Sequence, residues 1–319
     1  MMSLTINECA KWLGSRDRFL IISHSRPDGD ALGSSAGLCQ GLRDNGKIAY
    51  TLFNPEATGR YKEYTEPYIA PEDYKADYII AVDLADTGII QVNAKKYEAA
   101  VDLCIDHHMS NKHYARSELL LSDRASCGEI IFYVLRELEA SISPFTAKAL
   151  YMALATDTGC FRYKNTTAVT HRAAADLIEA GAPSGDLNRD FFMLKTRSRL
   201  LLEALMLQSL EFFMDGEAVM AVVTLDMMNK AGVTEEDMDD IAVISGQIRG
   251  TETSITLRQI NDAKWKVSVR TGVYANANLI CAEFGGGGHG MAAGGSIEGD
   301  IDTAKDIIKA AVKKHWKSQ

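Results

Sequence analysis

The sequence has few of the features that mark secreted, membrane or zinc-ribbon proteins. Its 319 residues include six cysteines, but no two of them form a Cys-x-x-C pair, so a zinc ribbon or a thioredoxin-like site has no support. No apolar run reaches the roughly 20 residues that a membrane helix needs, and the N-terminal segment lacks a signal peptide's apolar core. We therefore expect a cytoplasmic protein with reduced, scattered thiols and no membrane partner.

Basic residues are also fewer than acidic residues. The chain has 34 Lys and Arg against 43 Asp and Glu, a formal net charge of −9. A protein that coats long duplex DNA is normally basic, because binding neutralises phosphates, so long duplex DNA is not an expected partner. A short anionic substrate is compatible with the sequence, since local charge can oppose the net charge.

The rest of the composition is that of a globular protein. Apolar residues make up 46% and charged residues 24% of the chain, and the length suits two domains of roughly 150 residues. Short apolar runs alternate with helix patterns through the first half. This alternation predicts βαβ units, hence an α/β fold with a mainly parallel sheet flanked by helices. The predicted strands lie near 19–23, 48–53, 78–82 and 101–105, and the helices near 31–43, 128–139, 144–155 and 170–180.

The second half is organised differently. The pattern breaks near residue 185, and a helix pattern then runs from about 186 to 213. Strand patterns dominate afterwards, and a helix pattern over 303–316 follows them. We predict a smaller α/β domain with a mixed sheet in this half. The predicted division is a catalytic domain over 1–185, a connecting helix over 186–214 and a substrate-binding domain over 215–319.

Acidic and histidine side chains follow two of the predicted strands. His24, Asp28 and Asp30 lie within seven residues after the first strand, and Asp83 closes the strand over 78–82. Open α/β sheets bind ligands beyond the carboxyl ends of their strands. Carboxylates and an imidazole in one place suit a divalent cation. The alternative is structural, because an aspartate at such a position often caps a turn or a helix.

A third strand is followed by Asp106, His107 and His108. His107 could bind a metal, Asp106 could orient a neighbouring imidazole, and His108 could face a substrate phosphate. Asp157 lies at the end of a helix pattern, where the helix dipole disfavours a negative charge unless a cation compensates. Arg162 could hold a phosphate. Surface histidines in a turn and a solvated helix end are the alternatives.

The densest glycine tract lies over 285–295. Such a run can present backbone N–H groups to an anion. His289 could add a hydrogen bond, and Arg270, at the end of its strand, could reach the same anion. A flexible turn is the alternative.

The aspartates would place several negative charges around one cleft, which is unfavourable without compensation. Two divalent cations bridged by one carboxylate would supply that compensation, and two-metal sites with ions roughly 3.5–4 Å apart recur in phosphoryl hydrolases. The five aspartates concerned are Asp28, Asp30, Asp83, Asp106 and Asp157.

In their order along the chain, these motifs resemble those of the DHH phosphoesterases. The His-x-x-x-Asp-x-Asp motif over 24–30, Asp83, the Asp-His-His motif over 106–108 and Asp157 match the four metal-site motifs of that family. The glycine tract is similar to its DHH-associated C-terminal domain. The resemblance spans nearly the whole chain. The compact length is similar to the nanoRNase/pAp phosphatase branch, whose members degrade very short oligonucleotides and dephosphorylate 3′-phosphoadenosine 5′-phosphate (pAp).

The resemblance implies two divalent metal ions, most naturally Mn²⁺, with Mg²⁺ or Co²⁺ as substitutes. It places one ion on His24, Asp28, Asp83 and Asp157, and the other on Asp30, Asp83 and His107. It implies that a metal-bridging hydroxide attacks the phosphorus of a short single strand or a nucleotide bisphosphate. A homodimer is compatible with it. The implied catalytic residues are Asp83, Asp106, His108 and Arg162, and the implied substrate-binding residues are Arg270, Asn278, Gly286, Gly287, Gly288 and His289.

Three other functions are compatible with the same residues. One is a phosphodiesterase acting on the dinucleotide pApA or on cyclic di-AMP, and another is a RecJ-like 5′→3′ single-strand exonuclease. The third, a nucleotide sensor without catalysis, fits the complete ligand set least well. Family II pyrophosphatases share the N-terminal motifs, but the Gly-Gly-Gly-Gly-His tract argues against that function.

Overall fold

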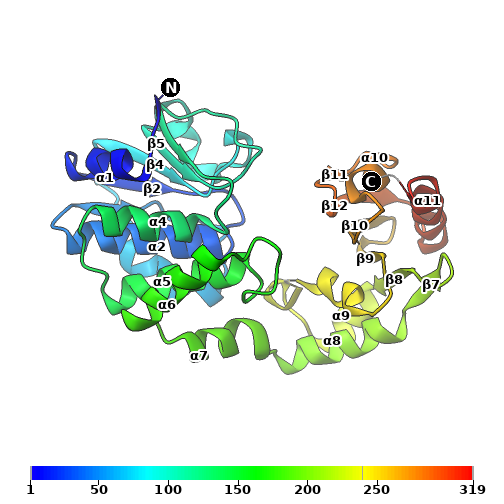
Figure 1. Ribbon diagram of the computed structural model, residues 1–319. Helices are drawn as coiled ribbons and strands as arrows, with labels where there is room; N and C mark the ends of the chain where they lie inside the picture. Colours follow the sequence, from blue (N-terminus) through cyan, green and yellow to red (C-terminus); the bar gives the residue numbers. More distant parts are fainter. Residues whose placement is uncertain (1, 239, 318–319) are drawn as a thin grey trace. The chain divides into compact units, whose positions relative to one another are not determined.

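The computed structural model describes residues 2–238 and 240–317 (Figure 1). The chain divides into an N-terminal unit that ends at Leu194 and a C-terminal unit that begins at Lys195. In the described ranges, no helix combines the length and the apolar character that crossing a membrane requires.

A six-stranded parallel sheet forms the centre of the N-terminal unit. The strand order is β1-β6-β5-β4-β2-β3, and every neighbouring pair is parallel. The parallel sheet predicted from the alternating pattern is therefore confirmed, although the pattern missed two of its strands, β1 and β6. The strands are β1 (Met2–Ser3), β2 (Phe19–Ile22), β3 (Ala49–Thr51), β4 (Tyr78–Val82), β5 (Leu103–Asp106) and β6 (Ser117–Leu120).

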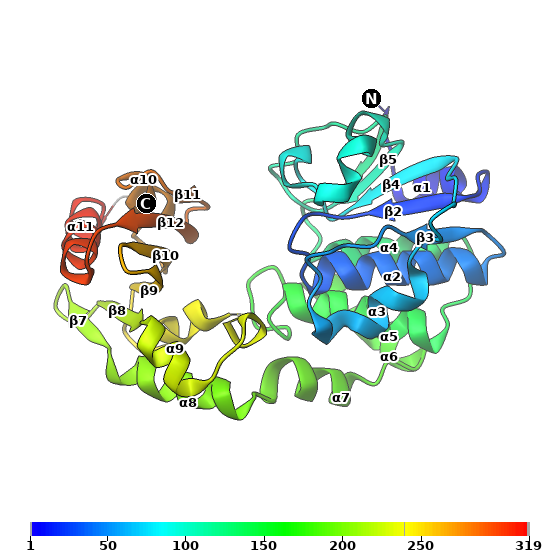
Figure 2. The ribbon, with the colours of Figure 1, turned by 180° about the vertical axis from the view of Figure 1, so that it is seen from behind.

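Both faces of this sheet are covered, which explains why its strands read as continuous apolar runs. Phe19 and Ile21 of β2 face a core shared with the helices, whereas Leu20 and Ile22 face a second core formed with residues 84–101. Figure 2 shows the short helices η3 and η4 of that second layer on the side away from α2. The elements are α1 (Ile6–Gly14), α2 (Gly29–Asp44), η1 (Gly59–Tyr61), α3 (Lys62–Thr65), η2 (Glu66–Tyr68), η3 (Thr87–Ile89), η4 (Val92–Ala100), α4 (Cys127–Glu137), α5 (Pro144–Asp157) and α6 (Ala168–Glu179).

A stripe of glycines lets α2 pack very closely against α5. Glycines at every fourth position lie on one face of the helix, since a helix turns once in 3.6 residues. A Cβ atom on Gly33 would lie 2.5 Å from the carbonyl oxygen of Ala149, and one on Gly37 would lie 2.5 Å from the Leu150 side chain. This packing brings the first turn of α2 beside the last turn of α5, where Asp157 lies.

The connection between the units is not the single helix that the sequence pattern predicts over 186–213. Helix α7 (Ser184–Asn188) leads into the π-helical turn η5 (Arg189–Met193), and Leu194 is extended. Thr196 then caps the new helix α8 (Arg197–Gln208) by accepting a hydrogen bond from the backbone N–H of Arg199 at 2.9 Å. The last three residues of the predicted helix form strand β7 (Glu211–Phe213) instead. The prediction of one continuous connecting helix over 186–214 was therefore wrong. The hydrophobic pattern continues across Thr196, so it does not show that one helix ends and another begins there.

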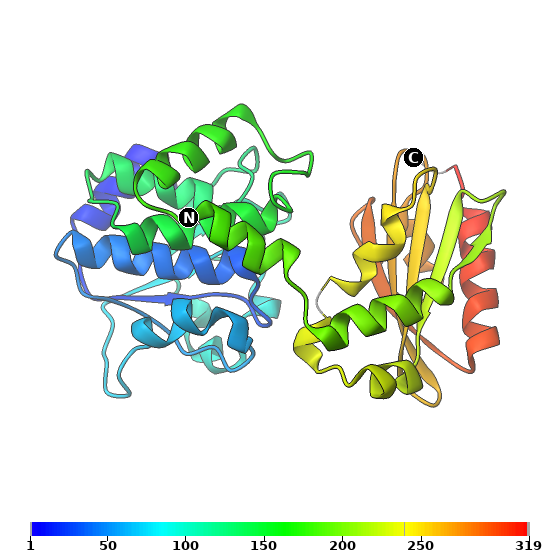
Figure 3. The same cartoon turned by 90° about the horizontal axis from the view of Figure 1, so that it is seen from below.

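The C-terminal unit contains a second six-stranded sheet, in the order β11-β12-β10-β9-β8-β7. Only β8 and β9 are parallel, so the predicted mixed sheet is confirmed. Helices α10 and α11 pack on one face, while α8 and α9 pack on the other face of β8 (Figure 3). The elements are β7 (Glu211–Phe213), β8 (Ala218–Val223), α9 (Leu225–Ala231), η6 (Glu235–Met238), η7 (Ile241–Gln247), β9 (Thr253–Asn261), β10 (Lys264–Thr271), α10 (Ala277–Ala282), β11 (Gly287–Gly288), β12 (Ala292–Glu298) and α11 (Ile301–Lys314).

Candidate metal centre

The carboxyl ends of β2, β4 and β5 meet at one edge of the parallel sheet, and the predicted metal-site residues lie there. His24 follows β2, Asp83 follows β4, and His107 follows β5. Asp157 does not belong to the sheet; it is the last residue of helix α5. The site is therefore built from parts of the chain that are distant in sequence and meet through sheet order and helix packing.

The two aspartates before and within α2 are held by different means. Asp28 caps α2 by accepting a hydrogen bond from a backbone N–H at 3.1 Å, and its residue is exposed. Asp30 is only 1% exposed. Its carboxylate accepts hydrogen bonds from the backbone N–H groups of Cys127 at 2.7 Å and Gly128 at 3.0 Å, and from the Ser34 hydroxyl at 2.8 Å. The first turn of α4 thus fixes the orientation of a buried carboxylate.

The spacing of the donor atoms suits shared cations. His107 Nε2 lies 3.7 Å from an oxygen of Asp30, 3.6 Å from one of Asp83 and 3.8 Å from one of Asp157. His24 Nε2 lies 3.6 Å from the other Asp83 oxygen. These separations are too long for hydrogen bonds. They are close to the roughly 3.0–3.6 Å that separates two ligands each about 2.1 Å from one ion.

Within the described part of the chain, the possible ligand atoms form three overlapping groups, in each of which all the atoms lie within 4.8 Å of one another. Asp83 belongs to two groups, as a bridging carboxylate would. Asp157 groups with Asp30 and His107, whereas the family resemblance assigns it to the other ion. The groups are His24, Asp28 and Asp83; Asp30, His107 and Asp157; and Asp83, His107 and His108.

Asp83 shows most clearly that these residues fit a cation. Asp83 is 3% exposed and its backbone is left-handed at φ 55°. Its Oδ1 atom is buried, and none of the described residues forms a hydrogen bond with it. A buried carboxylate oxygen without a donor is strongly unfavourable. Burial, reinforced by Asp30 and Asp28, raises the pKa of Asp83 well above its usual value. A divalent ion would resolve this cost, so the residues present fit such an ion.

Two further carboxyl groups are perturbed in the same direction. Burial, with the charge of Asp157 beside it, raises the pKa of Asp30 to about 7. Burial and the charge of Asp28 raise the pKa of Asp157 to about 7. Crowded buried carboxylates of this kind are typical of sites that hold a cation or exchange protons.

Asp106 orients His108. It is fully buried, and its Oδ1 accepts a hydrogen bond from Nδ1 of His108 at 2.8 Å. Burial would raise the pKa of Asp106, but the hydrogen bonds of His108 and Asn111 outweigh burial and lower it. The Asp106 hydrogen bond, opposed by burial, raises the pKa of His108 to about 9. Asp106 belongs to none of the possible ligand groups found among the described residues, and its carboxylate instead contacts His108 and Asn111.

Several supporting residues were missed in the sequence. Asn111 donates a 2.6 Å hydrogen bond to the second oxygen of Asp106, and the Arg124 carbonyl accepts from Nδ1 of His107 at 3.4 Å. The second contact leaves Nε2 of His107 free to bind a metal. Asn165 donates to the backbone carbonyl of Asp157 at 3.1 Å. Nothing local in the sequence marks these residues, because each acts across a loop.

Arg162 follows a strained turn after α5. Gly159, Cys160 and Phe161 all have positive φ angles, between 56° and 61°. The Nε–H group of Arg162 donates to the Gly159 carbonyl, and the residue is exposed. Left-handed non-glycine residues store strain and cluster at functional sites.

The glycine tract of the C-terminal unit has a structural use that was not predicted. A Cβ atom on Gly286 would lie 2.5 Å from the Gly294 carbonyl oxygen, and one on Gly288 would lie 2.6 Å from the Ala292 carbonyl oxygen. The expectation that the tract presents free N–H groups to an anion was wrong for four of them. The N–H groups of Gly285, Gly286, Gly288 and His289 donate to acceptors within the protein.

The remaining predicted substrate residues lie around this hairpin. Arg270 is near the end of β10, and no carboxylate of the described residues lies within 4.0 Å of its guanidinium. Asn278, in α10, accepts the Gly288 N–H at 2.9 Å. His289 is exposed, and Gly287 belongs to β11.

A parallel sheet with a histidine- and aspartate-rich carboxyl edge, followed by a mixed-sheet domain, has the donor groups that two-metal phosphoryl hydrolases use. Residues 18–155 match the DHH family, N-terminal domain, and residues 216–314 match the DHHA1 domain. The chain is 30% identical to the bifunctional oligoribonuclease and PAP phosphatase NrnA of Thermus thermophilus, over 92% of this chain and 89% of the relative. The corresponding protein of Bacillus subtilis is 25% identical, over 91% and 92%. The chain therefore belongs to the DHH family.

Solved structures have the same architecture. An exopolyphosphatase-related protein from Bacteroides fragilis is 26% identical and superposes with a TM-score of 0.88, covering 97% of this chain and 95% of that protein. RecJ of Thermus thermophilus, solved in complex with Mn²⁺, is 18% identical with a TM-score of 0.55, covering 97% of this chain and 54% of that protein. The second similarity establishes only a common fold.

Proposed function

We propose that this chain is a two-metal phosphoesterase that hydrolyses short oligonucleotides and pAp. Relatives named for those two activities align with this chain along nearly their whole length. The observation that carries the proposal is the buried, unpartnered oxygen of Asp83, which lies 3.6 Å from ring nitrogens of both His107 and His108. A cation is the natural partner for that oxygen.

The proposed ligands are the residues whose donor atoms converge at the sheet edge. Bound there, a divalent ion lowers the pKa of water and compensates negative charge on phosphoryl oxygens. Mn²⁺ suits the mixture of imidazole and carboxylate donors, and Mg²⁺ or Co²⁺ are substitutes; the Mn²⁺ complex of RecJ supports that choice of ion. The proposed ligands are His24, Asp28, Asp30, Asp83, His107 and Asp157.

The chain's own residues would orient and protonate the substrate. Because Asp106 holds Nδ1 of His108, Nε2 is the atom proposed to donate a proton to the leaving oxygen. Arg162 is proposed to bind the phosphate that is attacked. Arg270, Asn278 and His289 are proposed to bind the rest of the substrate, together with the hairpin segment formed by Gly286, Gly287 and Gly288.

A competition assay tests the proposal. The purified protein is incubated with Mn²⁺ and equimolar pAp, pApA, a five-nucleotide RNA, a 24-nucleotide single strand and cyclic di-AMP, and products are followed by mass. We expect rapid loss of pAp and of the short oligomers while the long strand is spared. Preferential loss of the long strand or of the cyclic dinucleotide would overturn the substrate assignment. Turnover by Asp83→Asn at the wild-type rate would overturn the mechanism.

A further inference from the structure

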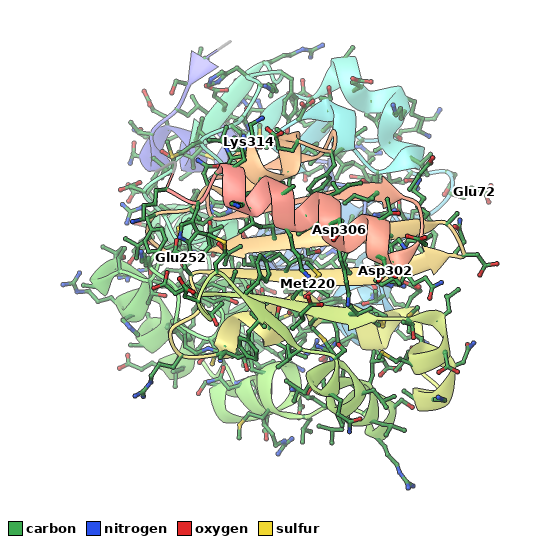
Figure 4. The ribbon with its side chains drawn as sticks, turned by 90° about the vertical axis from the view of Figure 1, so that its right-hand side faces the viewer. Glu72, Met220, Glu252, Asp302, Asp306 and Lys314 are labelled. Atoms are coloured by element: carbon green, nitrogen blue, oxygen red, sulfur yellow. The ribbon has the colours of Figure 1, made fainter. Side chains whose placement is uncertain are left out.

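One buried acid organises the turn that joins β10 to α10 in the C-terminal unit. Glu252 immediately precedes β9, and Figure 4 shows it at one end of the sheet. It is 9% exposed, and neither the metal centre nor the predicted substrate residues include it.

Four consecutive backbone N–H groups donate to this one residue. The Glu252 carbonyl accepts from Gly272 at 2.8 Å. Its carboxylate accepts from Val273 at 2.9 Å through Oε2, and from Tyr274 at 2.8 Å and Ala275 at 2.9 Å through Oε1. Burial opposes the charge, but these backbone donors outweigh burial and lower the pKa of the carboxyl group. The turn therefore depends on an ionised, buried acceptor.

Gly272 allows the Glu252 carboxylate to lie close against the turn. A Cβ atom on Gly272 would lie 2.6 Å from Oε2 of Glu252, so a larger residue would displace the carboxylate. Residues on both sides of the turn are also hydrogen-bonded to the glycine hairpin. Thr271 donates its hydroxyl to the Gly290 carbonyl at 2.9 Å, and Ala277 donates its N–H to the same oxygen at 2.6 Å.

The residues on either side of the turn are those proposed to bind substrate. Arg270 lies two residues before Gly272, and Asn278 lies three residues after Ala275. The path of the turn consequently sets the position of the guanidinium relative to the Asn278 side chain. Binding groups that are misplaced by about 1 Å can lose much of their effect on a bound substrate.

We propose that Glu252 is a positioning residue for substrate recognition: it fixes the turn over 272–275 so that Arg270 and Asn278 are set for the nucleotide. This inference rests on the proposed function, because it takes Arg270 and Asn278 as substrate-binding residues. Glu252 touches neither substrate nor metal in this proposal and acts only through the turn.

Glu252→Gln tests the proposal in the full-length protein loaded with Mn²⁺. A glutamine has one acceptor oxygen, so its NH₂ group must face one or two of the three N–H groups. We expect the KM for pApA to rise roughly ten- to a hundredfold, with kcat almost unchanged. Hydrolysis of bis(p-nitrophenyl) phosphate, which lacks a nucleoside, should keep its wild-type rate. Amide hydrogen exchange over 272–275 should accelerate.

Glu211→Gln is the matched control, because that carboxylate also lies in the C-terminal unit and binds Lys305 and Lys309. It should leave the KM unchanged. Gly272→Ala displaces the Glu252 carboxylate without removing its charge, so it should raise the KM in the same way. This second variant tests the proposal if Glu252→Gln fails to fold. Faster exchange with an unchanged KM, or unchanged exchange, would overturn the proposal. A wild-type protein inactive on both pApA and pAp would instead refute the proposed function, whereas the exchange data would still report on the turn.

Discussion

Without metal, the protein should lose stability as the pH rises, because its buried carboxylates resist ionisation. The pKa of Asp30 is about 7 in the folded protein and 3.8 when unperturbed. The folded state therefore binds more protons than the unfolded state between these values, and stability falls as the pH rises through them. A difference of about three units corresponds to about 4 kcal/mol for this group alone.

Two neighbouring groups act in the same direction. Asp157 also has a folded pKa of about 7, although its side chain is 28% exposed and its contribution is correspondingly smaller. The pKa of His108 is raised to about 9, so the stability that it contributes is present below pH 6.5 and is lost towards pH 9. The free energy of unfolding should decline across the whole range from about pH 4 to pH 9.

Bound Mn²⁺ should reverse this dependence. Metal ligands bind in their deprotonated forms, so the ion stabilises the folded state most where the free carboxylates destabilise it. The measurement is urea denaturation followed by circular dichroism at pH 5, 6, 7 and 8, with EDTA or with Mn²⁺. We expect the stabilisation by Mn²⁺ to grow steadily with pH.

Asp83→Asn is the informative variant in this series. It replaces a buried carboxyl group whose ionisation is costly in the folded state, so with EDTA at pH 8 the variant should be at least as stable as the wild type, and it should respond little to Mn²⁺. A metal-free wild type whose stability is constant from pH 5 to pH 8 would refute the argument. So would an equal gain from Mn²⁺ at every pH.

Two further substitutions test how the site is held in place. Asp106→Asn should lower kcat for pAp by roughly 10–100-fold while bound metal, measured by elemental analysis, stays near the wild-type content; an unchanged kcat would refute the role of Asp106 in orienting His108. Gly33→Ala should destabilise the protein by about 1–3 kcal/mol in denaturant titrations, because its Cβ atom would meet a backbone oxygen at 2.5 Å. Gly185→Ala, with nothing within 4 Å of its Cβ position, is the matched control, and equal stability of the two variants would contradict the packing argument.

The sequence predicts the parts of the fold whose signals are local. Continuous apolar runs predict β2, β4 and β5, since strands buried on both faces need apolar residues throughout. Strand β1 is two residues long and β6 contains Ser117 and Glu118, so neither has such a run. The break at Thr196 was missed for the opposite reason, because an apolar pattern continued on both sides of a single capping residue.

Within the site, the sequence predicts the side chains that follow strands, because their position depends on the sheet alone. Asp83 and His107 are of this kind. The partners that hold such groups cannot be predicted in the same way. The N–H groups of Cys127 and Gly128 reach Asp30 across almost a hundred positions of the chain, and their side chains take no part in those hydrogen bonds.

Glycine shows why composition alone misleads about function. The tract over 285–288 suggests an anion-binding loop, yet three of its N–H groups donate to acceptors in α10, and at Gly286 and Gly288 the backbone approaches β12 too closely for side chains. The glycines of α2 attract less notice, yet they let the helix approach α5 and so bring Asp30 near Asp157. The role of a glycine is therefore best judged from the atoms that a Cβ at its position would approach. In this protein, the glycines that matter most for the metal centre lie in the helix.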